Sequence, residues 1–486
     1  MVPRRIRPRT RYDAAAAGAV DFWRSSLIDN VLGLAVLLAI AAALRTHVGV
    51  LRRLAIPDGI VAGALGLVLG PNLVHALPLS GRDLEPLVYH GFAIVFVAVG
   101  LQGAERVRAT GSARSLSFGF VALAVVQSLL GFALLAIWFS ATGDELHPGL
   151  GFMIMLGFAQ GPGQALAFGS AWEPLGLVNG AQIGLLYAAL GFAWCCVLGV
   201  PLVAFARRRG WLDPPPVHVP AATPITVTHS ATHTSDRTST MEPLTVQIVT
   251  IACVYAAVFG VLWSITRALP PSSNFAASLW GFHFLVGSSL AIALRKIVDT
   301  GRIRIPFDDG LLGRIAGTAI DFTTAAALCA IQLDELGDML VPILVMSSIG
   351  GVLTLVLCLW LTRRAFEDAP FSHMLVLYGT CTGTVPTGLA LLRIVDPELR
   401  GPVARSTVIA ATAAVPLGIP LFLGVIPLSI AQWSSGFTQT VALTLGLLAV
   451  YTVVLVWIWH RTGSLRWLRP LTSVWPRAPD EPAPPS

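Results

Sequence analysis

Residues 149–172 read GLGFMIMLGFAQGPGQALAFGSAW, which places two short apolar arms on either side of Gln160–Gln164. As helices, the arms would be only about 12–15 Å long. Neither arm can therefore cross a hydrocarbon core of about 30 Å. The glycines and proline between them leave backbone groups unpaired, which is tolerated only where protein or a water-filled cavity satisfies them. The segment predicts a re-entrant hairpin that enters and leaves on one face of a membrane.

A second interrupted segment of the same kind lies at residues 371–395, FSHMLVLYGTCTGTVPTGLALLRIV. Its first arm ends near Gly379, and its second arm starts after the tip that surrounds Gly383. Two apolar arms again flank a stretch rich in glycine, threonine and proline. Two ordinary kinked helices are the alternative interpretation of both segments.

The two segments can be aligned by their glycines and by the acid that follows each of them. Gly157-x-x-x-Gly161 matches Gly379-x-x-x-Gly383. Downstream, the acid-proline pair at Glu173 matches the pair that begins at Asp396. Paired, interrupted apolar segments in two inverted halves are the best sequence indication of a transport site near the middle of a membrane.

Composition places the chain in a membrane. Of its 486 residues, 55% are hydrophobic and 12% are charged, whereas soluble domains carry about 25% charged residues. The mean hydropathy is +0.74. The net charge of +6 does not indicate nucleic acid, because the arginines occupy short loops between apolar runs. The pattern predicts an all-α polytopic membrane protein.

Apolar runs long enough to cross a bilayer divide the chain into two halves. The expected spans are Ile28–Leu44, Pro57–Val74, Leu87–Gln102, Ser117–Phe139, Gly180–Phe205, Val246–Ile265, Leu279–Leu294, Ile315–Leu333, Met339–Leu361, Ser406–Ile430 and Val441–Trp459. The domains follow from them: a basic N-terminal segment (1–27), a first inverted repeat of about five helices (28–206), a disordered cytoplasmic linker (207–243), a second inverted repeat (244–430), and an extra transmembrane helix with a polar tail (431–486).

Loop charges predict opposite orientations for the two halves. Basic clusters such as Arg207–Arg209 are expected on the cytoplasmic side, whereas the turns at Asp144–Glu145 and Asp334–Asp338 contain no Lys or Arg. This orientation places the central linker in the cytoplasm. The basic stretch Arg4–Arg11 conflicts with the scheme, because it would lie outside.

The two tips resemble the glycine loops of the glutamate:sodium symporter family. Gly161–Gly169, GPGQALAFG, is similar to the family's first loop, and Gly383–Ala390, GTVPTGLA, keeps the G-x-x-P-T core of its second loop. The resemblance covers roughly residues 28–430. It implies two inverted five-helix halves and an elevator-like exchange of access. The glutamines and proline of the first tip and Val385 depart from the family pattern, which puts the substrate's identity in doubt.

Polar residues in and near these segments are the site candidates. The substrate-binding candidates share a place at or just after a tip: Gln160, Gly161, Gly163, Gln164, Gly383, Thr384, Thr387 and Arg393. Four residues offer hard oxygens, which a small cation prefers: Asp321, Thr323, Thr324 and Thr382. A structural acid is the alternative for Asp321, and a snorkelling anchor is the alternative for Arg393.

The function that we expect is sodium-coupled symport of glutamate or a related anionic amino acid or dicarboxylate. The partners expected are this small anionic substrate and membrane lipid, with no nucleic acid; a homodimer is left open. No cofactor or metal is expected beyond sodium, and the location expected is the bacterial inner (plasma) membrane. The sequence contains neither the HExxH motif of metalloproteases nor the GxSxG motif of serine hydrolases, so no motif of these kinds indicates an enzyme. A sodium- or proton-coupled carrier of another organic anion such as citrate, a channel and a membrane-embedded enzyme are the alternatives.

Overall fold

The computed structural model describes residues 26–49, 51, 56–70, 72–74, 76–77, 79–102, 111–212, 241–270, 276, 279–399, 401–462, 465 and 475. The regular structure in these ranges is helical, and nine of their helices are long and apolar enough to cross a membrane. The prediction of an all-α polytopic membrane protein is confirmed. The basic start of the chain, residues 213–240 of the central linker and most of the polar tail lie outside the described residues.

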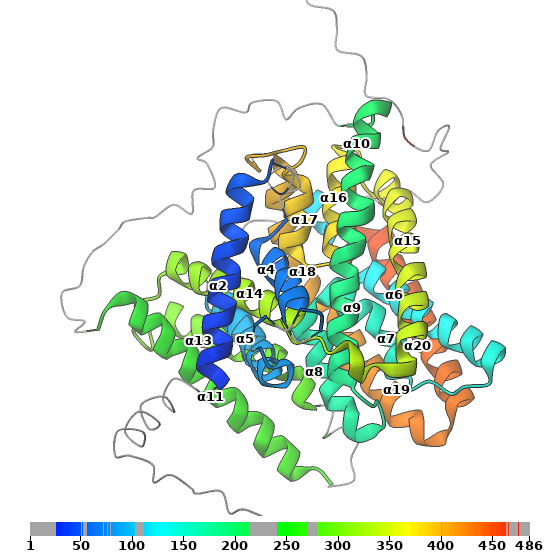
Figure 1. Cartoon of the computed structure of the whole chain (residues 1–486), viewed down its shortest axis with the longest axis horizontal. Helices are drawn as coiled ribbons and strands as arrows, with labels where there is room; N and C mark the ends of the chain where they lie inside the picture. The colour runs from blue at the N-terminus through cyan, green and yellow to red at the C-terminus, as the bar shows by residue number, and fades with distance from the viewer. Residues whose placement is uncertain are drawn as a thin grey trace, which may run out of the picture.

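Six helices form one bundle around the packed pair α5 and α14, on the left of Figure 1. We call it the α5–α14 bundle. Its members are α2 (Ser26–His47), α4 (Asp58–Leu69), α5 (Gly81–Leu101), α11 (Pro243–Ala268), α13 (His283–Asp299) and α14 (Asp309–Cys329), with the short turns η4 (Trp280–Phe282) and η5 (Leu333–Glu335) at its edges.

The remaining helices form a second bundle, which we call the hairpin bundle because it contains both interrupted segments (Figure 1). Its members are α6 (Gly111–Thr142), α7 (Gly149–Ile154), η1 (Met155–Gln160), α8 (Pro162–Trp172), η2 (Glu173–Leu175), α9 (Gly180–Trp194), η3 (Cys195–Gly199), α10 (Val200–Arg209), η6 (Gly337–Met339), α15 (Leu340–Ala365), α16 (Pro370–Cys381), α17 (Val385–Leu392), α18 (Pro402–Ile419), η7 (Pro420–Val425), α19 (Ile426–Gln432), η8 (Trp433–Ser435) and α20 (Phe437–Thr462).

Contacts within each bundle come in matched pairs. In the α5–α14 bundle, α2 packs on α4 and α4 on α14, while α11 packs on α13 and α13 on α5. In the hairpin bundle, α6 packs on α18 and α15 packs on α9. In chain order, α2, α4, α5, α6 and α9 of the first half have α11, α13, α14, α15 and α18 as counterparts in the second half. Replacing each helix by its counterpart turns the first contact of a pair into the second.

Several expected spans differ from the helices observed, and two of them show why. The run Pro57–Val74 contains α4, which ends at Leu69 and is only about 18 Å long. The helix stops because Gly70 adopts an extended conformation and the next residue is Pro71, which has no N–H to donate. The expected span 315–333 is α14, which begins at Asp309 because the Asp308 carboxylate accepts a hydrogen bond from Leu311 N.

Apolar side chains cover the outside of the bundles as well as their cores. Phe259 on α11 is 61% exposed and Val453 on α20 is 68% exposed. Large exposed apolar side chains along long helices are what a hydrocarbon environment accommodates. The extra helix expected near the C-terminus is α20, which packs against α6 and α19.

Candidate functional site

The first interrupted segment folds back on itself at Gly161. A methyl group placed on Gly149, at the start of α7, would lie 2.7 Å from the ring of Trp172, at the end of α8. The incoming arm ends in the π-helical turn η1, and Gly161 has φ 88° and ψ 178°. Only glycine adopts this conformation without strain. Pro162 then starts α8, where its missing N–H costs nothing.

The second interrupted segment also folds back, between α16 and α17. A methyl group on Gly388 would lie 2.7 Å from the carbonyl oxygen of Val376, so the two arms are in direct contact. The tip consists of Thr382, Gly383 and Thr384. The helix α17 has its proline in its first turn, like α8.

The two tips touch. A methyl group on Gly161 would lie 2.8 Å from Cγ2 of Thr384 and 4.0 Å from the carbonyl oxygen of Gly383. Both α8 and α17 begin at this junction. Their first N–H groups have no partner within the helix, and the positive ends of their dipoles lie there. The junction therefore offers backbone donors and partial positive charge to an anion.

Two buried side-chain oxygens near the tips have no hydrogen-bond partner among the residues that the structure describes. Gln164, in the first turn of α8, is 2% exposed, and its Oε1 is unpaired. The Oγ1 of Thr380, in the last turn of α16, is also buried and unpaired. Thr387 is buried, with its Oγ1 3.3 Å from the Oγ1 of Thr384. Unpaired oxygens of this kind can accept a hydrogen bond from a substrate or coordinate a small cation.

A glutamine that the sequence analysis did not single out holds the second tip. Gln127, in the middle of α6, is 1% exposed. Its Nε2 donates to the carbonyl oxygen of Cys381 at 2.7 Å and to Thr354 Oγ1 at 3.1 Å. Its Oε1 has no hydrogen-bond partner within the described part of the chain. An amide within the apolar run 117–139 was the signal available in the sequence.

The junction lies at the boundary between the two bundles. A methyl group on Gly163 would lie 2.1 Å from Cγ of Phe92, so the aromatic ring on α5 packs directly on the backbone of the first tip. Phe92 in turn packs against Phe96 and Phe284 of its own bundle. The helix α8 packs against both α5 and η4. One side of the first tip is therefore covered by the α5–α14 bundle.

The structure separates the four residues expected to bind a cation. Thr382 is fully buried at the tip, where its Oγ1 donates to the Tyr378 carbonyl oxygen at 2.7 Å. Asp321, Thr323 and Thr324 lie on α14, which packs against α5, α4 and α2, whereas α16 packs against α17, α15 and α6. No group of three or more His, Cys, Asp or Glu side chains suited to a metal occurs among the described residues.

Two of the three α14 residues, Thr323 and Thr324, pack against glycines of their own bundle. A methyl group on Gly91 would lie 2.4 Å from Thr323 Oγ1, and one on Gly59 would lie 3.3 Å from Thr324 Cβ. Asp321 is exposed and lies within electrostatic reach of Asp58 and Arg45. Arg45 and Asp58 form an ion pair, with Arg45 Nε 3.0 Å from Asp58 Oδ1.

Arg393 lies at the far end of α17 from the tip. The helix has eight residues and so is about 12 Å long. Arg393 caps its C-terminus and is exposed. Its guanidinium is not part of the junction in this conformation.

The two acid-proline pairs have a structural role in common. Glu173 Oε1 accepts a hydrogen bond from Ala181 N at 3.0 Å, at the start of α9. Asp396 Oδ2 accepts one from Gly401 N at 2.8 Å, at the start of α18. Each acid thus caps the helix that follows its interrupted segment.

A family model described as "Sodium/glutamate symporter" matches residues 26–395 of the chain. The match covers well over half of the sequence and includes both interrupted segments. No curated protein matches the chain.

Proposed function

Because the chain belongs to the sodium/glutamate symporter family, which consists of transporters and not enzymes, we propose that it carries glutamate or a related anionic amino acid or dicarboxylate together with sodium. The meeting of the two tips is the observation that carries this proposal. Two helix N-termini, Gly161 and Gly383 converge at one point, and glycine lets backbone N–H groups approach a carboxylate closely.

We place the coupling cation beside the second tip. Thr382, the Gln127 Oε1 and the Thr380 Oγ1 supply oxygen atoms there, the last two without a partner. The alternative position, around Asp321 with Thr323 and Thr324, has an exposed carboxylate and a threonine packed against glycine. Sodium accepts several neutral oxygen ligands, so a carboxylate is not required at the tip.

The proposed architecture is a pair of inverted repeats with re-entrant hairpins. The matched helix contacts of the two halves support it, as does the length of the arms, which is too short for a bilayer. In the proposed inner-membrane orientation, the basic end of α10 at Arg207–Arg209 lies in the cytoplasm. The start of α9 then lies outside.

Transport is proposed to occur by an elevator-like movement of the hairpin bundle against the α5–α14 bundle. Both tips belong to the hairpin bundle, and the ring of Phe92 borders them from the other side. A rigid displacement of the hairpin bundle would move the junction past this aromatic wall and expose it to the other face.

Uptake by the purified protein in proteoliposomes tests the proposal. We expect saturable uptake of radiolabelled glutamate that requires an inward sodium gradient and is inhibited by unlabelled aspartate or a dicarboxylate. Uptake of citrate alone would reassign the substrate. A conductance without saturation, or formation of a chemical product, would contradict the proposal.

A further inference from the structure

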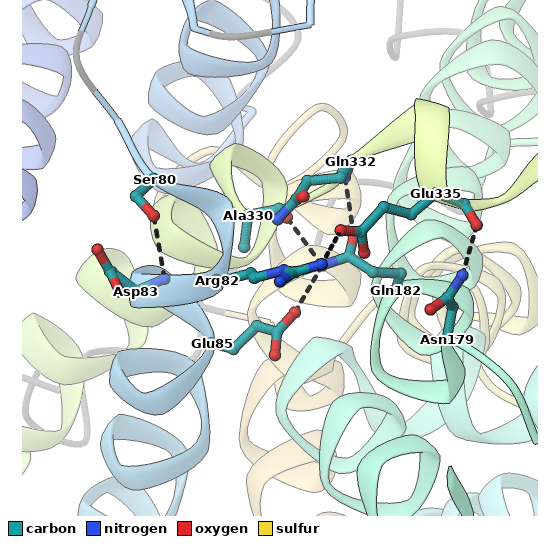
Figure 2. A network of polar contacts seen from close by, with 9 residues as sticks. All are labelled: Ser80, Arg82, Asp83, Glu85, Asn179, Gln182, Ala330, Gln332 and Glu335. Atoms are coloured by element: carbon teal, nitrogen blue, oxygen red, sulfur yellow. Dashed lines mark hydrogen bonds and ion pairs between the residues drawn. The ribbon is translucent and has the colours of Figure 1, made fainter.

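A polar network connects the two bundles where α5 and α9 begin and α14 ends (Figure 2). At its centre is Gln182, in the first turn of α9, which is 2% exposed. Its Nε2 donates to Glu85 Oε1 at 2.6 Å and to the Ala330 carbonyl oxygen at 3.1 Å. Its Oε1 accepts from Gln332 N at 2.8 Å.

All three partners of Gln182 belong to the other bundle. A fourth hydrogen bond crosses the boundary beside it, because Asn179 Nδ2 donates to the Glu335 carbonyl oxygen at 2.5 Å. Asn179 is the N-cap residue of α9 and has φ 54° and ψ 36°, a left-handed conformation that asparagine tolerates better than most residues. Two side chains of α9 therefore make four hydrogen bonds to the α5–α14 bundle.

The partners of these side chains are themselves fixed. Glu335 forms an ion pair with Arg82, with Nη2 2.8 Å from Oε1. The Asn72 amide bridges the same segment by donating to the Ile331 carbonyl oxygen at 2.7 Å and accepting from Leu333 N at 3.2 Å. The segment 330–335 is thus held to α5 and to Asn72 within its own bundle and offers α9 a prearranged set of acceptors and donors.

We propose that Gln182 and Asn179 form a latch that holds the hairpin bundle in the position seen here. This inference rests on the proposed movement of the two bundles. The four bonds must break together before the hairpin bundle can slide, because all of them start from the first turn of one rigid helix. In the proposed orientation the latch lies on the outer side, and its release would free the hairpin bundle to expose the junction there.

Replacing the amide of Gln182 by a carboxylate should open the latch. Gln182→Glu places two carboxylates against each other where Gln182 and Glu85 now share a hydrogen bond. The double variant Glu85→Gln with Gln182→Glu restores a donor and an acceptor in exchanged positions and should recover part of the latch. Asp83→Asn is the matched control, because Asp83 lies on the same turn as Glu85 but its carboxylate points away from the network (Figure 2).

The experiment measures how fast a cysteine at the junction reacts with a membrane-impermeant thiol reagent added from outside. The reporter is Thr384→Cys in a full-length background whose six cysteines are replaced. We expect Gln182→Glu to raise the rate of external labelling about fivefold, as loss of about one hydrogen bond's net free energy would. The double variant should lie between Gln182→Glu and the parent, and Asp83→Asn should equal the parent.

Several results would separate the latch from the transport function. Equal labelling in Gln182→Glu and the parent, with sodium-dependent uptake intact in the protein that keeps Thr384, would overturn the latch alone. Absence of uptake in that protein would overturn the proposed function instead. If Gln182→Glu fails to insert, Asn179→Ala removes a single bond of the latch, and an unchanged labelling rate in that variant would also count against the proposal.

Discussion

Gly161 and Thr384 are 223 residues apart in the chain (384 − 161), yet a methyl group on the glycine would lie 2.8 Å from the Cγ2 of the threonine. This contact joins the tips of the two interrupted segments. Position 161 does not tolerate a side chain for two independent reasons, the lack of space and the positive φ of Gly161.

Gly161→Ala should abolish uptake and lower stability. The conformation at φ 88°, ψ 178° costs a residue with a Cβ about 1–3 kcal/mol, and the new methyl would displace Thr384. Gly143→Ala is the control: Gly143 also has a positive φ, of 80°, but nothing lies within 4 Å of its Cβ position. Thermal unfolding in detergent together with uptake checks the pair. Normal transport by Gly161→Ala would show that the tips need not touch.

Gln127→Leu should lower the apparent affinity for sodium more than it lowers the stability of the folded protein. The substitution removes the donor to the Cys381 carbonyl oxygen and the unpaired Oε1, both beside the second tip. We expect the sodium concentration for half-maximal uptake to rise by about tenfold, which corresponds to about 1.4 kcal/mol. Ser128→Ala is the control, since among the described residues the Ser128 hydroxyl donates only to the Ala124 carbonyl oxygen of its own helix. If both variants raise the sodium concentration for half-maximal uptake, the effect comes from the packing of α6 and not from Gln127.

The class of the protein, the approximate positions of most helices and both interrupted segments could be predicted from the sequence. Each depends on the run length or spacing of apolar residues and glycines, which is local information. The partners of Gln127 and Gln182 could not be predicted, because an amide in an apolar run looks the same whether it faces lipid, a tip or the other bundle. Asp321 and Thr382 were grouped by their chemistry, and only the helix packing shows that they lie in different bundles.

Acidification should destabilise the start of the first interrupted segment through His147. This histidine lies in the loop before α7, and its Nδ1 accepts a hydrogen bond from Gly149 N at 3.0 Å. Burial lowers the pKa of His147 to about 4 from an ordinary 6.5. The unfolded chain therefore binds a proton between these values while the folded protein does not, so stability is complete above pH 6.5 and falls as the pH drops toward 4.

The His147→Asn variant tests this, because the asparagine Oδ1 can accept a hydrogen bond but does not titrate in this range. Melting temperatures between pH 4 and pH 7 should fall more steeply for the natural sequence than for the variant. The difference should correspond to at most about 3 kcal/mol, the free energy of a shift of this size. If the melting temperatures of the two proteins change with pH in the same way, His147 is not buried in its neutral form.

The position of the coupling cation can be decided by comparing Thr382→Val with Asp321→Asn. If sodium binds at the second tip, Thr382→Val removes a hydroxyl oxygen from its surroundings and should raise the sodium requirement about tenfold. Asp321→Asn should change it by less than about twofold, because Asp321 is exposed on the other bundle near the Arg45–Asp58 ion pair. Thr407→Val controls for the loss of a buried hydroxyl: Thr407 and Thr382 each donate at 2.7 Å to the carbonyl oxygen four residues earlier, but Thr407 lies on α18. Sodium titration of uptake, at saturating substrate, provides the measurement. The opposite result, a large shift in Asp321→Asn with none in Thr382→Val, would move the cation to α14 and reject the tip as its site.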